Sequence, residues 1–414
     1  MYLTHLSLTN VRNFIRLEVD LPPGPTLLVG ANAQGKTSLL EAVYVLARAT
    51  SPHAGHDREL INFLALETPE PFARLVGEAR AQDRLQRIEV RLVLRRASAA
   101  EEPHLRKDVL VNGVRQRTRS HAGGLSAVIF MPQDLRVVEG PPAERRRYLD
   151  SAIAQADPAY AESLALYTSV LSQRNALLRQ LQEANGQAAA RPGRAAADQL
   201  EAWDEQLAEP GAAVLRARAL ALAELERLAA PIHDSLTRGA ESLRLDYLPS
   251  YDPLPRPAGQ LDLPLEAPLD RTAVPLAAIR AGLLRALAER RADDIARGAT
   301  TTGPHRDEIR LRASGIDLRT YGSRGQNRTA MLSLKLAEVD WIRQRTGEWP
   351  VLLLDEVLAE LDVERRGALL ERALQAEQAL LTGADPAMFG EAIRRQASVR
   401  RVVSGRLETL DAPG

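Results

Sequence analysis

A glycine-rich segment near the amino terminus constrains the fold of this chain more than any other feature. Residues 30–37 read Gly-Ala-Asn-Ala-Gln-Gly-Lys-Thr, which matches the phosphate-binding pattern G-x-x-x-x-G-K-[ST]. An apolar run at 26–29 precedes this segment, and a helical pattern at 38–46 follows it. Because phosphate-binding loops join a buried strand to a helix, this context predicts an α/β fold that binds a nucleotide.

The chemistry of this loop can be predicted residue by residue. Its two glycines permit a tight turn whose backbone N–H groups face phosphate oxygens, and the following helix adds a favourable dipole. Lys36 is expected to reach the β- and γ-phosphates, and the Thr37 hydroxyl is expected to bind Mg²⁺. The residues predicted to hold ATP are Gly30, Ala31, Asn32, Ala33, Gln34, Gly35, Lys36, Thr37 and Ser38.

A second motif stands near the opposite end of the chain. The apolar run 351–354 ends in two adjacent carboxylates, Asp355 and Glu356, which is the Walker B pattern. Asp355 is expected to bind Mg²⁺, a hard cation that prefers oxygen ligands. Glu356 is expected to orient or deprotonate the attacking water. A buried strand with an acidic helix cap would give the same pattern, but its pairing with a phosphate loop favours a nucleotide site.

The long interval between the two motifs predicts an insertion, because simple nucleotide kinases and GTPases place them much closer. Helical patterns at 144–182 and 198–228 suggest an antiparallel helical arm, with a break expected at Pro210 and Gly211. Residues 183–197, rich in Ala, Gly and Pro, would form its tip. An ordinary two-helix hairpin packed on the domain is the alternative.

We therefore expect an α/β chain with an ABC-type P-loop ATPase head and an inserted helical arm domain. The predicted head comprises residues 1–140 and 299–414, and the predicted arm comprises 141–298. Elements with clear patterns are strands at 73–79, 87–95, 126–130, 243–247 and 308–313, a hairpin turn at Asn112-Gly113, helices at 276–297 and 324–345, and a proline-rich loop at 249–275.

Two further segments fit a nucleotide site of this type. Gln133 follows the strand predicted at 126–130, as the glutamine of a Q-loop does, and could contact Mg²⁺ or the attacking water; it could equally be a polar loop residue. Ser323 stands before the helix predicted at 324–345, where a hydroxyl and two glycines favour an anion site. In ABC-type ATPases such a segment binds the γ-phosphate of the other subunit. A plain capped helix start is the alternative.

Composition excludes some functions. The formal net charge is zero, so DNA binding would need a local basic surface. Arg145, Arg146 and Arg147 form a basic run, but such runs usually lie on a solvated helix face. The chain lacks cysteine, an apolar run of membrane-spanning length and a secretory signal pattern, and we expect a cytoplasmic protein with no membrane association.

With these motifs the chain resembles the RecF family of bacterial recombination mediators, a branch of the ABC/SMC-like ATPases. The resemblance spans nearly the whole chain in the family's order. It is carried by residues 8–14, 30–37, 131–135, 139–150, 303–308, 323–326 and 354–362. The segments 139–150 and 303–308 are far more specific than either nucleotide motif, whereas 51–61 matches the family only loosely and lacks its arginine.

The resemblance implies an ATP-dependent homodimer that binds double-stranded DNA near gaps. With the partners RecO and RecR, such proteins help to load RecA onto gapped DNA, and a weak, slow ATPase activity releases the dimer. By motif match, Lys36, Thr37, Gln133, Asp355 and Glu356 would act on ATP and Mg²⁺ in the same subunit. Ser323 would act on the nucleotide of the other subunit, Asp362 would lie in the loop that crosses the dimer interface, and Arg12 would lie near the phosphates or base.

Two other functions would require different sequence features. An SMC-like ATPase subunit of a nuclease or phage-defence system would carry longer coiled coils or an appended nuclease domain. A P-loop kinase or GTPase would need closer motifs, and the guanine-reading pattern Asn-Lys-x-Asp is absent from the sequence.

Overall fold

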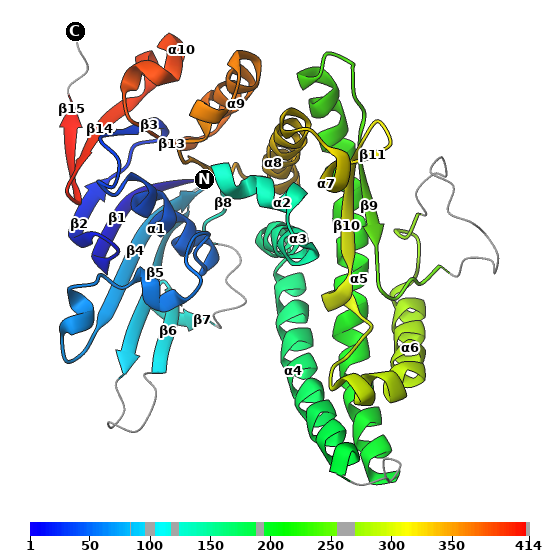
Figure 1. Cartoon of the computed structure of the whole chain (residues 1–414). Coiled ribbons are helices and arrows are strands. Elements are labelled where there is room, and N and C mark those ends of the chain that lie inside the picture. Colours follow the sequence, from blue (N-terminus) through cyan, green and yellow to red (C-terminus); the bar gives the residue numbers. More distant parts are fainter. Residues whose placement is uncertain (83, 96–103, 117–123, 188–193, 255–269, 411–414) are drawn as a thin grey trace. The chain divides into compact units, whose positions relative to one another are not determined.

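The computed structural model describes residues 1–82, 84–95, 104–116, 124–187, 194–254 and 270–410 (Figure 1). The chain divides into two compact units. The first, here called the P-loop unit, comprises Met1–Asp134 and Lys335–Gly414. The second, here called the helical unit, comprises Leu135–Leu334. No helix in the described part of the chain is long and apolar enough to cross a membrane.

One sheet of the P-loop unit is antiparallel and has the strand order β2-β1-β4-β5-β6-β7. Apolar residues alternate along its strands, so that one face is buried; Ile88, Val90 and Leu92 of β5 are fully buried. Asn112 and Gly113 both have positive φ between β6 and β7, which confirms the predicted hairpin turn. The strands are β1 Tyr2–Val11, β2 Phe14–Asp20, β4 Phe72–Ala81, β5 Arg84–Arg95, β6 His104–Val111 and β7 Val114–Gln116.

The second sheet carries both nucleotide motifs. Its strand order is β15-β14-β3-β13-β12-β8, and all neighbouring pairs are parallel except β14 and β15. Strands β3, β13, β12 and β8 are almost wholly buried and rich in Ala, Val and Leu, as expected for parallel strands covered on both faces. The strands are β3 Gly24–Val29, β8 Ala127–Phe130, β12 Val351–Leu354, β13 Gln378–Gly383, β14 Ser398–Val403 and β15 Arg406–Leu410.

Helix α1, Lys36–Arg48, packs against strands of both sheets. Its buried face includes Leu39, Val43 and Leu46, which join one hydrophobic core with residues of both sheets. Gly77 of β4 allows a close approach, because a Cβ there would lie 2.8 Å from Leu46 Cδ1. The phosphate loop is thus attached to a helix that the core holds in place. Helices α9 Val363–Gln375 and α10 Gly390–Gln396 also belong to this unit, as do the residues of α8, Arg324–Thr346, from Lys335 onwards.

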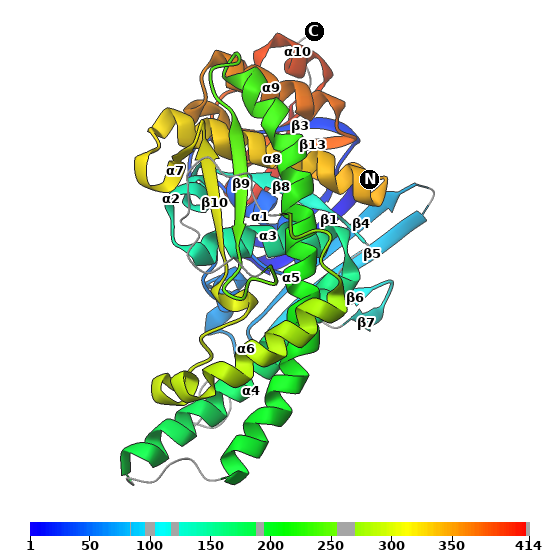
Figure 2. The same ribbon diagram turned by 90° about the vertical axis from the view of Figure 1, so that its right-hand side faces the viewer.

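The helical unit consists of long helices and a three-stranded sheet of order β11-β10-β9. Helices α4 and α5 lie side by side in both views (Figures 1 and 2). The tip predicted at 183–197 is helical at 183–187 and 194–197, because α4 and α5 extend into it, and its middle, 188–193, lies outside the described residues. The elements are α2 Arg136–Glu139, α3 Pro142–Ala156, α4 Pro158–Gln187, α5 Arg194–Leu236, β9 Leu243–Leu248, α6 Leu276–Arg297, β10 Glu308–Ala313, β11 Ile316–Asp317 and α7 Leu318–Tyr321. Helix α8, Arg324–Thr346, begins in this unit.

Two details of the predicted helices are wrong. The single pattern at 144–182 forms two helices, because the Asp157 carboxylate caps a new helix that begins at Pro158. The break expected at Pro210 does not occur, and α5 continues through it. Tertiary packing explains the continuity: Gly211 is so tightly enclosed that a Cβ there would lie 2.8 Å from Leu283 Cδ2 of α6.

The extent of the helical unit differs from the predicted arm, 141–298. Strand β10 pairs with β9 over its full length, from Glu308 with Leu248 to Ala313 with Leu243. This pairing ties residues 308–313 to the helical unit, whereas the predicted head, 299–414, includes them. The part of the Pro-rich loop at 255–269 lies outside the described residues.

Buried charges hold the helical unit together. Arg218 of α5 donates to both carboxylate oxygens of Asp150 on α3, at 2.8 and 2.9 Å, and to Asp307 Oδ2 at 3.1 Å. Asp307 also accepts hydrogen bonds from the Tyr247 hydroxyl and the Ser250 N–H. The segments that are most specific to the family, 139–150 and 303–308, therefore meet in the interior of this unit.

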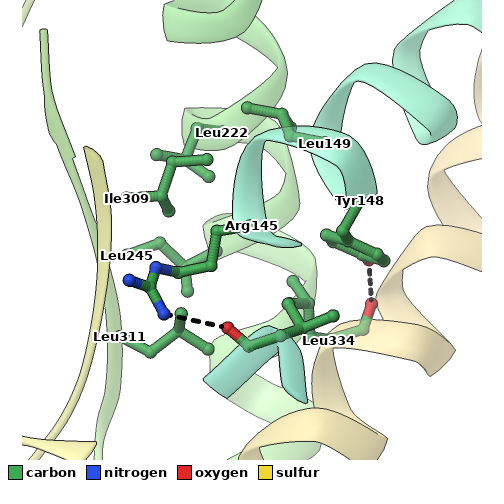
Figure 3. A pocket seen from close by; sticks show the side chains of 9 residues that line it. Arg145, Tyr148, Leu149, Leu222, Leu245, Ile309, Leu311 and Leu334 are labelled. Atoms are coloured by element: carbon green, nitrogen blue, oxygen red, sulfur yellow. Dashed lines mark hydrogen bonds between the residues drawn. The ribbon is translucent and has the colours of Figure 1, made fainter. Parts of the chain in front are cut away.

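The basic run at 145–147 is divided between interior and surface, which corrects the expectation of a solvated face. Arg145 is buried and donates to both oxygens of Glu308 at 2.7 and 2.8 Å, Arg146 donates to the Asp307 carbonyl, and Arg147 is exposed. The stem of Arg145 lines a small apolar pocket (Figure 3). The other lining residues are Val137, Tyr148, Leu149, Leu222, Leu245, Ile309, Leu311 and Leu334.

Candidate nucleotide-binding site

The phosphate loop follows β3, and its conformation depends on residues with positive φ. Gly30 has a φ of 154° and Gly35 a φ of 113°. A Cβ at Gly30 would lie 2.5 Å from the Val402 carbonyl oxygen, so the backbone there has no room for a side chain. Ala33 has a φ of 63° and carries the strain of a left-handed residue. Residues 31–33 are exposed at the tip of the loop.

The turn between β14 and β15 supports the loop from one side. Gln34 accepts two hydrogen bonds from it: the Ser404 N–H donates to the side-chain Oε1 at 2.7 Å, and the Gly405 N–H donates to the backbone carbonyl at 3.2 Å. Gly405 also lies close to Asn13, whose carbonyl oxygen would be 2.6 Å from a Cβ at this position. No sequence motif predicts this support, because it joins segments from opposite ends of the chain.

Lys36 is buried, with 3% of its surface exposed, and its ammonium faces the loop. Its Nζ donates to the carbonyl oxygens of Gly30 and Ala31 at 2.9 and 3.0 Å. The same nitrogen lies 3.3 Å from Oε1 of Glu356, the second carboxylate of the Walker B motif. The structure therefore brings together the cation and the acidic residue that the two motifs predict.

Thr37 and Asp355 are in direct contact. Thr37 Oγ1 donates to Asp355 Oδ1 at 3.0 Å, because β3 and β12 lie on either side of β13 and end at the same edge of the sheet. Burial raises the pKa of Asp355, and hydrogen bonds from Thr382 and Thr37 oppose this increase. A hydroxyl and a carboxylate in contact form the kind of oxygen donor set that suits Mg²⁺. Ser38 lies in the same first turn of α1.

Glu356 has an unusual backbone for a residue with a side chain, with a φ of 52°. Its N–H donates to Thr382 Oγ1 at 2.9 Å, and its side chain is 46% exposed. The exposed carboxylate is accessible to water, as its predicted role requires. The neighbouring carboxylate of Asp355 is buried at 6% exposure, so the two acidic residues have different environments.

Gln133 is placed in the same unit, in a short 3-10 helix that follows β8. Its amide nitrogen lies 2.8 Å from His53 Nδ1, so the amide donates and the imidazole accepts. The sequence did not single out His53, which the fold places beside Gln133. Ser51 positions it, because its hydroxyl accepts the N–H groups of His53 and Ala54 at 3.0 and 2.7 Å. No spacing rule links residues 53 and 133, so only the fold reveals this pair.

Arg12 is engaged within the P-loop unit. Its Nε and Nη2 donate to the two carboxylate oxygens of Glu41 at 2.7 and 2.8 Å, and this contact raises the pKa of the guanidinium further. Glu41 is buried on α1 and also accepts a hydrogen bond from the Ser51 hydroxyl. Asp362 is the N-cap of α9, where its carboxylate accepts the Arg365 N–H at 2.9 Å.

Ser323 belongs to the helical unit and caps the start of α8. Its Oγ accepts the Gln326 N–H at 3.2 Å, and its own N–H donates to Gln326 Oε1 at 2.9 Å, which is a capping box. The Gln326 amide in turn donates to Glu241. The serine and its backbone are exposed and held in a fixed geometry.

The sheet order, the phosphate loop and the carboxylate pair define an α/β ATPase of the ABC type with an inserted helical arm domain. The family model of the RecF/RecN/SMC N terminal domain matches residues 2–407. The DNA replication and repair protein RecF of Roseiflexus castenholzii is 43% identical over 98% of this chain and 99% of its own length. The protein of the same name from Bacillus subtilis is 37% identical over 98% and 100%.

Solved structures agree with these relatives. A structure of the recombination mediator protein RecF-ATPrS in the RecFOR pathway has a TM-score of 0.79 and 29% identity, covering 99% of this chain and 98% of that one. A structure of RecF-ATP in the same pathway has a TM-score of 0.79 and 28% identity, covering 99% of each chain. This chain belongs to the RecF family of ABC/SMC-like ATPases.

Proposed function

We propose that this protein is an ATP-dependent, DNA-binding recombination mediator that dimerises on ATP. The observation that carries the proposal is the convergence of Lys36, Thr37, Asp355 and Glu356 at one edge of one sheet. Relatives named DNA replication and repair protein RecF support the cellular role, and a similar structure of RecF-ATP supports the ligand.

The residues of the site fit ATP and Mg²⁺. The loop 30–37 offers backbone N–H groups and a buried ammonium to the triphosphate, while Thr37 and Asp355 offer oxygen ligands to the cation, with Gln133 as a further candidate. When bound, Mg²⁺ would neutralise charge on the phosphate oxygens. Occupation by a phosphate would give Lys36 a new anionic partner in place of Glu356.

In this proposal Glu356 accepts a proton from the attacking water, and ATP is hydrolysed to ADP and phosphate. The exposed carboxylate is held beside the loop by a fixed backbone, which suits a general base. We propose that hydrolysis is weak, is stimulated by DNA, and acts as a switch that ends dimerisation.

Dimerisation would complete the site with residues of a second copy. Ser323 of that copy would contact the γ-phosphate, and its Asp362 would lie at the dimer interface. The capping box supports this role for Ser323, because it holds an exposed hydroxyl at the start of a long helix. The nucleotide would then be bound by both subunits, which explains why ATP would favour the dimer.

The proposed partners are double-stranded and gapped DNA, RecR, and through it RecO and RecA. A formal net charge of zero excludes a global electrostatic attraction to DNA. DNA contacts would therefore be made by local clusters of arginines that bind the phosphates of the DNA backbone. Binding should weaken steeply with salt and show little sequence preference. The similar structures come from the RecFOR pathway, which supports the choice of protein partners.

Sedimentation velocity with and without ATP, and with gapped duplex DNA, tests both parts of the proposal. ATP should convert monomer to dimer, and Lys36→Arg or Ser323→Arg should prevent this. Ser169→Arg, at an exposed position on α4, is a matched control that should dimerise normally. Normal ATP-driven dimerisation of either Lys36→Arg or Ser323→Arg would refute the shared-nucleotide dimer.

A further inference from the structure

Thr382 contacts both Walker B carboxylate residues. It lies in β13, is 3% exposed, and places a single hydroxyl near Asp355, the Glu356 backbone nitrogen and, at the longer distance of 3.4 Å, the Leu354 carbonyl oxygen. Thr382 Oγ1 is 2.9 Å from Asp355 Oδ1 and 2.9 Å from the Glu356 backbone nitrogen. One hydroxyl can donate one hydrogen bond and accept others. It accepts the Glu356 N–H and donates to the Asp355 carboxylate, which lies closer than the Leu354 carbonyl and is the stronger acceptor.

The register of the sheet explains this position. Strands β12 and β13 are parallel, and Leu354 pairs with Leu381 at the end of β12. The chain leaves β12 immediately afterwards, so Asp355 and Glu356 no longer belong to the strand. Thr382, one residue beyond the last pair, is the side chain that β13 presents to them.

Glu356 needs this support because its backbone is left-handed, with a φ of 52°. Residues with a side chain adopt this conformation only where the surroundings fix it. The hydrogen bond to Thr382 fixes the Glu356 N–H, and therefore the direction in which its carboxylate leaves the chain. The same hydroxyl and Thr37 both donate to Asp355 Oδ1, which fixes that carboxylate from two sides.

We propose that Thr382 is a positioning residue that aligns Asp355 and Glu356 for ATP hydrolysis. The inference rests on the proposed ATPase function and adds a residue to its site. Thr382 itself touches neither nucleotide nor water in this account. Its loss should therefore slow hydrolysis while leaving the binding of the triphosphate, which depends on the loop and Lys36, nearly unchanged.

The variants Thr382→Val and Thr382→Ser separate the hydroxyl from the shape of the side chain. Valine keeps the shape and removes the hydroxyl, whereas serine keeps the hydroxyl. Thr26 provides a matched control: it is fully buried in β3, two strands from β12, and its hydroxyl has no hydrogen-bond partner in the described structure. Thr26→Val should therefore behave like the unchanged protein.

Steady-state hydrolysis and the binding of a fluorescent ATP analogue are the first measurements. We expect Thr382→Val to lower kcat by about 10- to 100-fold, the range of a lost alignment contact, with less than about a threefold change in the Kd of the analogue. Thr382→Ser should recover most of kcat. Unchanged hydrolysis by Thr382→Val, or a serine variant as slow as the valine variant, would overturn the proposal.

Hydrogen exchange at the Glu356 amide gives a second readout that needs no activity. This amide should be protected in the unchanged protein, in Thr382→Ser and in Thr26→Val, and should exchange faster in Thr382→Val. Equal protection in all four proteins would overturn the positioning role. A different result would separate the contact from the function. If only Thr382→Val exchanged faster but the unchanged protein neither bound nor hydrolysed ATP, the hydrogen bond to Glu356 would be confirmed and the proposed ATPase function would be refuted.

Discussion

Thr37 Oγ1 lies 3.0 Å from Asp355 Oδ1, although 318 residues separate the two in sequence. The fold therefore brings the two predicted Mg²⁺ ligands into direct contact. It also places a carboxylate in a buried environment, where the charged form is disfavoured. The buried carboxylate should therefore favour ATP hydrolysis but lower the free energy of unfolding of the protein.

Asp355→Asn tests that relation between activity and stability. Burial raises the pKa of Asp355, so above the ordinary carboxylate pKa its charge favours the unfolded chain. The variant should therefore melt at a higher temperature at pH 7 without nucleotide. Hydrolysis should fall by about 100-fold, equivalent to about 3 kcal/mol of transition-state stabilisation.

Asp293→Asn is the control for this experiment, because Asp293 is exposed on α6 and its side chain is 59% accessible. It should change neither the melting temperature nor the hydrolysis rate. A lower melting temperature for Asp355→Asn, combined with hydrolysis at the normal rate, would contradict both parts of the prediction.

Ala33 offers a test of strain in the phosphate loop. Its φ of 63° should cost about 1 kcal/mol relative to an unstrained residue. Ala33→Val should lower the free energy of unfolding by at least about 1 kcal/mol more, since β-branched side chains tolerate this conformation least. Ala31→Val, at an exposed position in the same loop without positive φ, should have little effect. Urea unfolding measures both variants, and equal destabilisation would argue against strain at residue 33.

Local patterns predicted much of the P-loop unit. The phosphate loop, the Walker B strand and the hairpin turn at Asn112-Gly113 depend on short segments whose residue types determine their conformation. The contact between Thr37 and Asp355, in contrast, depends on the order of the sheet, in which β13 separates β3 from β12.

Long-range contacts set the limits of prediction. The supports of the site, such as Thr382 beneath Glu356 and the β14–β15 turn beside Gln34, join segments that no local pattern relates. The break expected at Pro210 failed for the same reason, because packing against α6 outweighs a helix-breaking residue. Arg145 looked like a surface cation because its partner, Glu308, is distant in the sequence.

His305 should make the stability of the helical unit depend on pH. Burial lowers its pKa to about 4, and the neutral ring accepts from the Tyr167 hydroxyl at Nδ1 and donates to the Thr300 carbonyl at Nε2. The unfolded chain, with an ordinary pKa of 6.5, binds the proton more readily. Stability should therefore be complete above pH 6.5 and decrease as the pH falls towards 4.

The variant His305→Gln separates this histidine from other groups, because glutamine stays neutral throughout. Between pH 7 and pH 5, the unchanged protein should lose about 2 kcal/mol more stability than the variant, from a shift of this size. Urea unfolding at both pH values gives the difference. Equal losses in the two proteins would show that His305 is not buried in its neutral form.

The buried Arg218 allows a test of how much the interior charges contribute to the stability of the helical unit. Its guanidinium pairs with Asp150 and Asp307, and the side chain is 2% exposed. Arg218→Met leaves two carboxylates without their cation, and breaking a buried pair in this way typically costs about 3–5 kcal/mol.

Arg147→Met is the matched control: it removes an arginine that is 74% exposed and should cost less than about 0.5 kcal/mol. Urea unfolding followed by circular dichroism, which detects the loss of helix, should show the large change only for Arg218→Met. Similar losses of unfolding free energy in the two variants would mean that apolar packing stabilises this unit, and not the buried ion pairs that join 139–150 to 303–308.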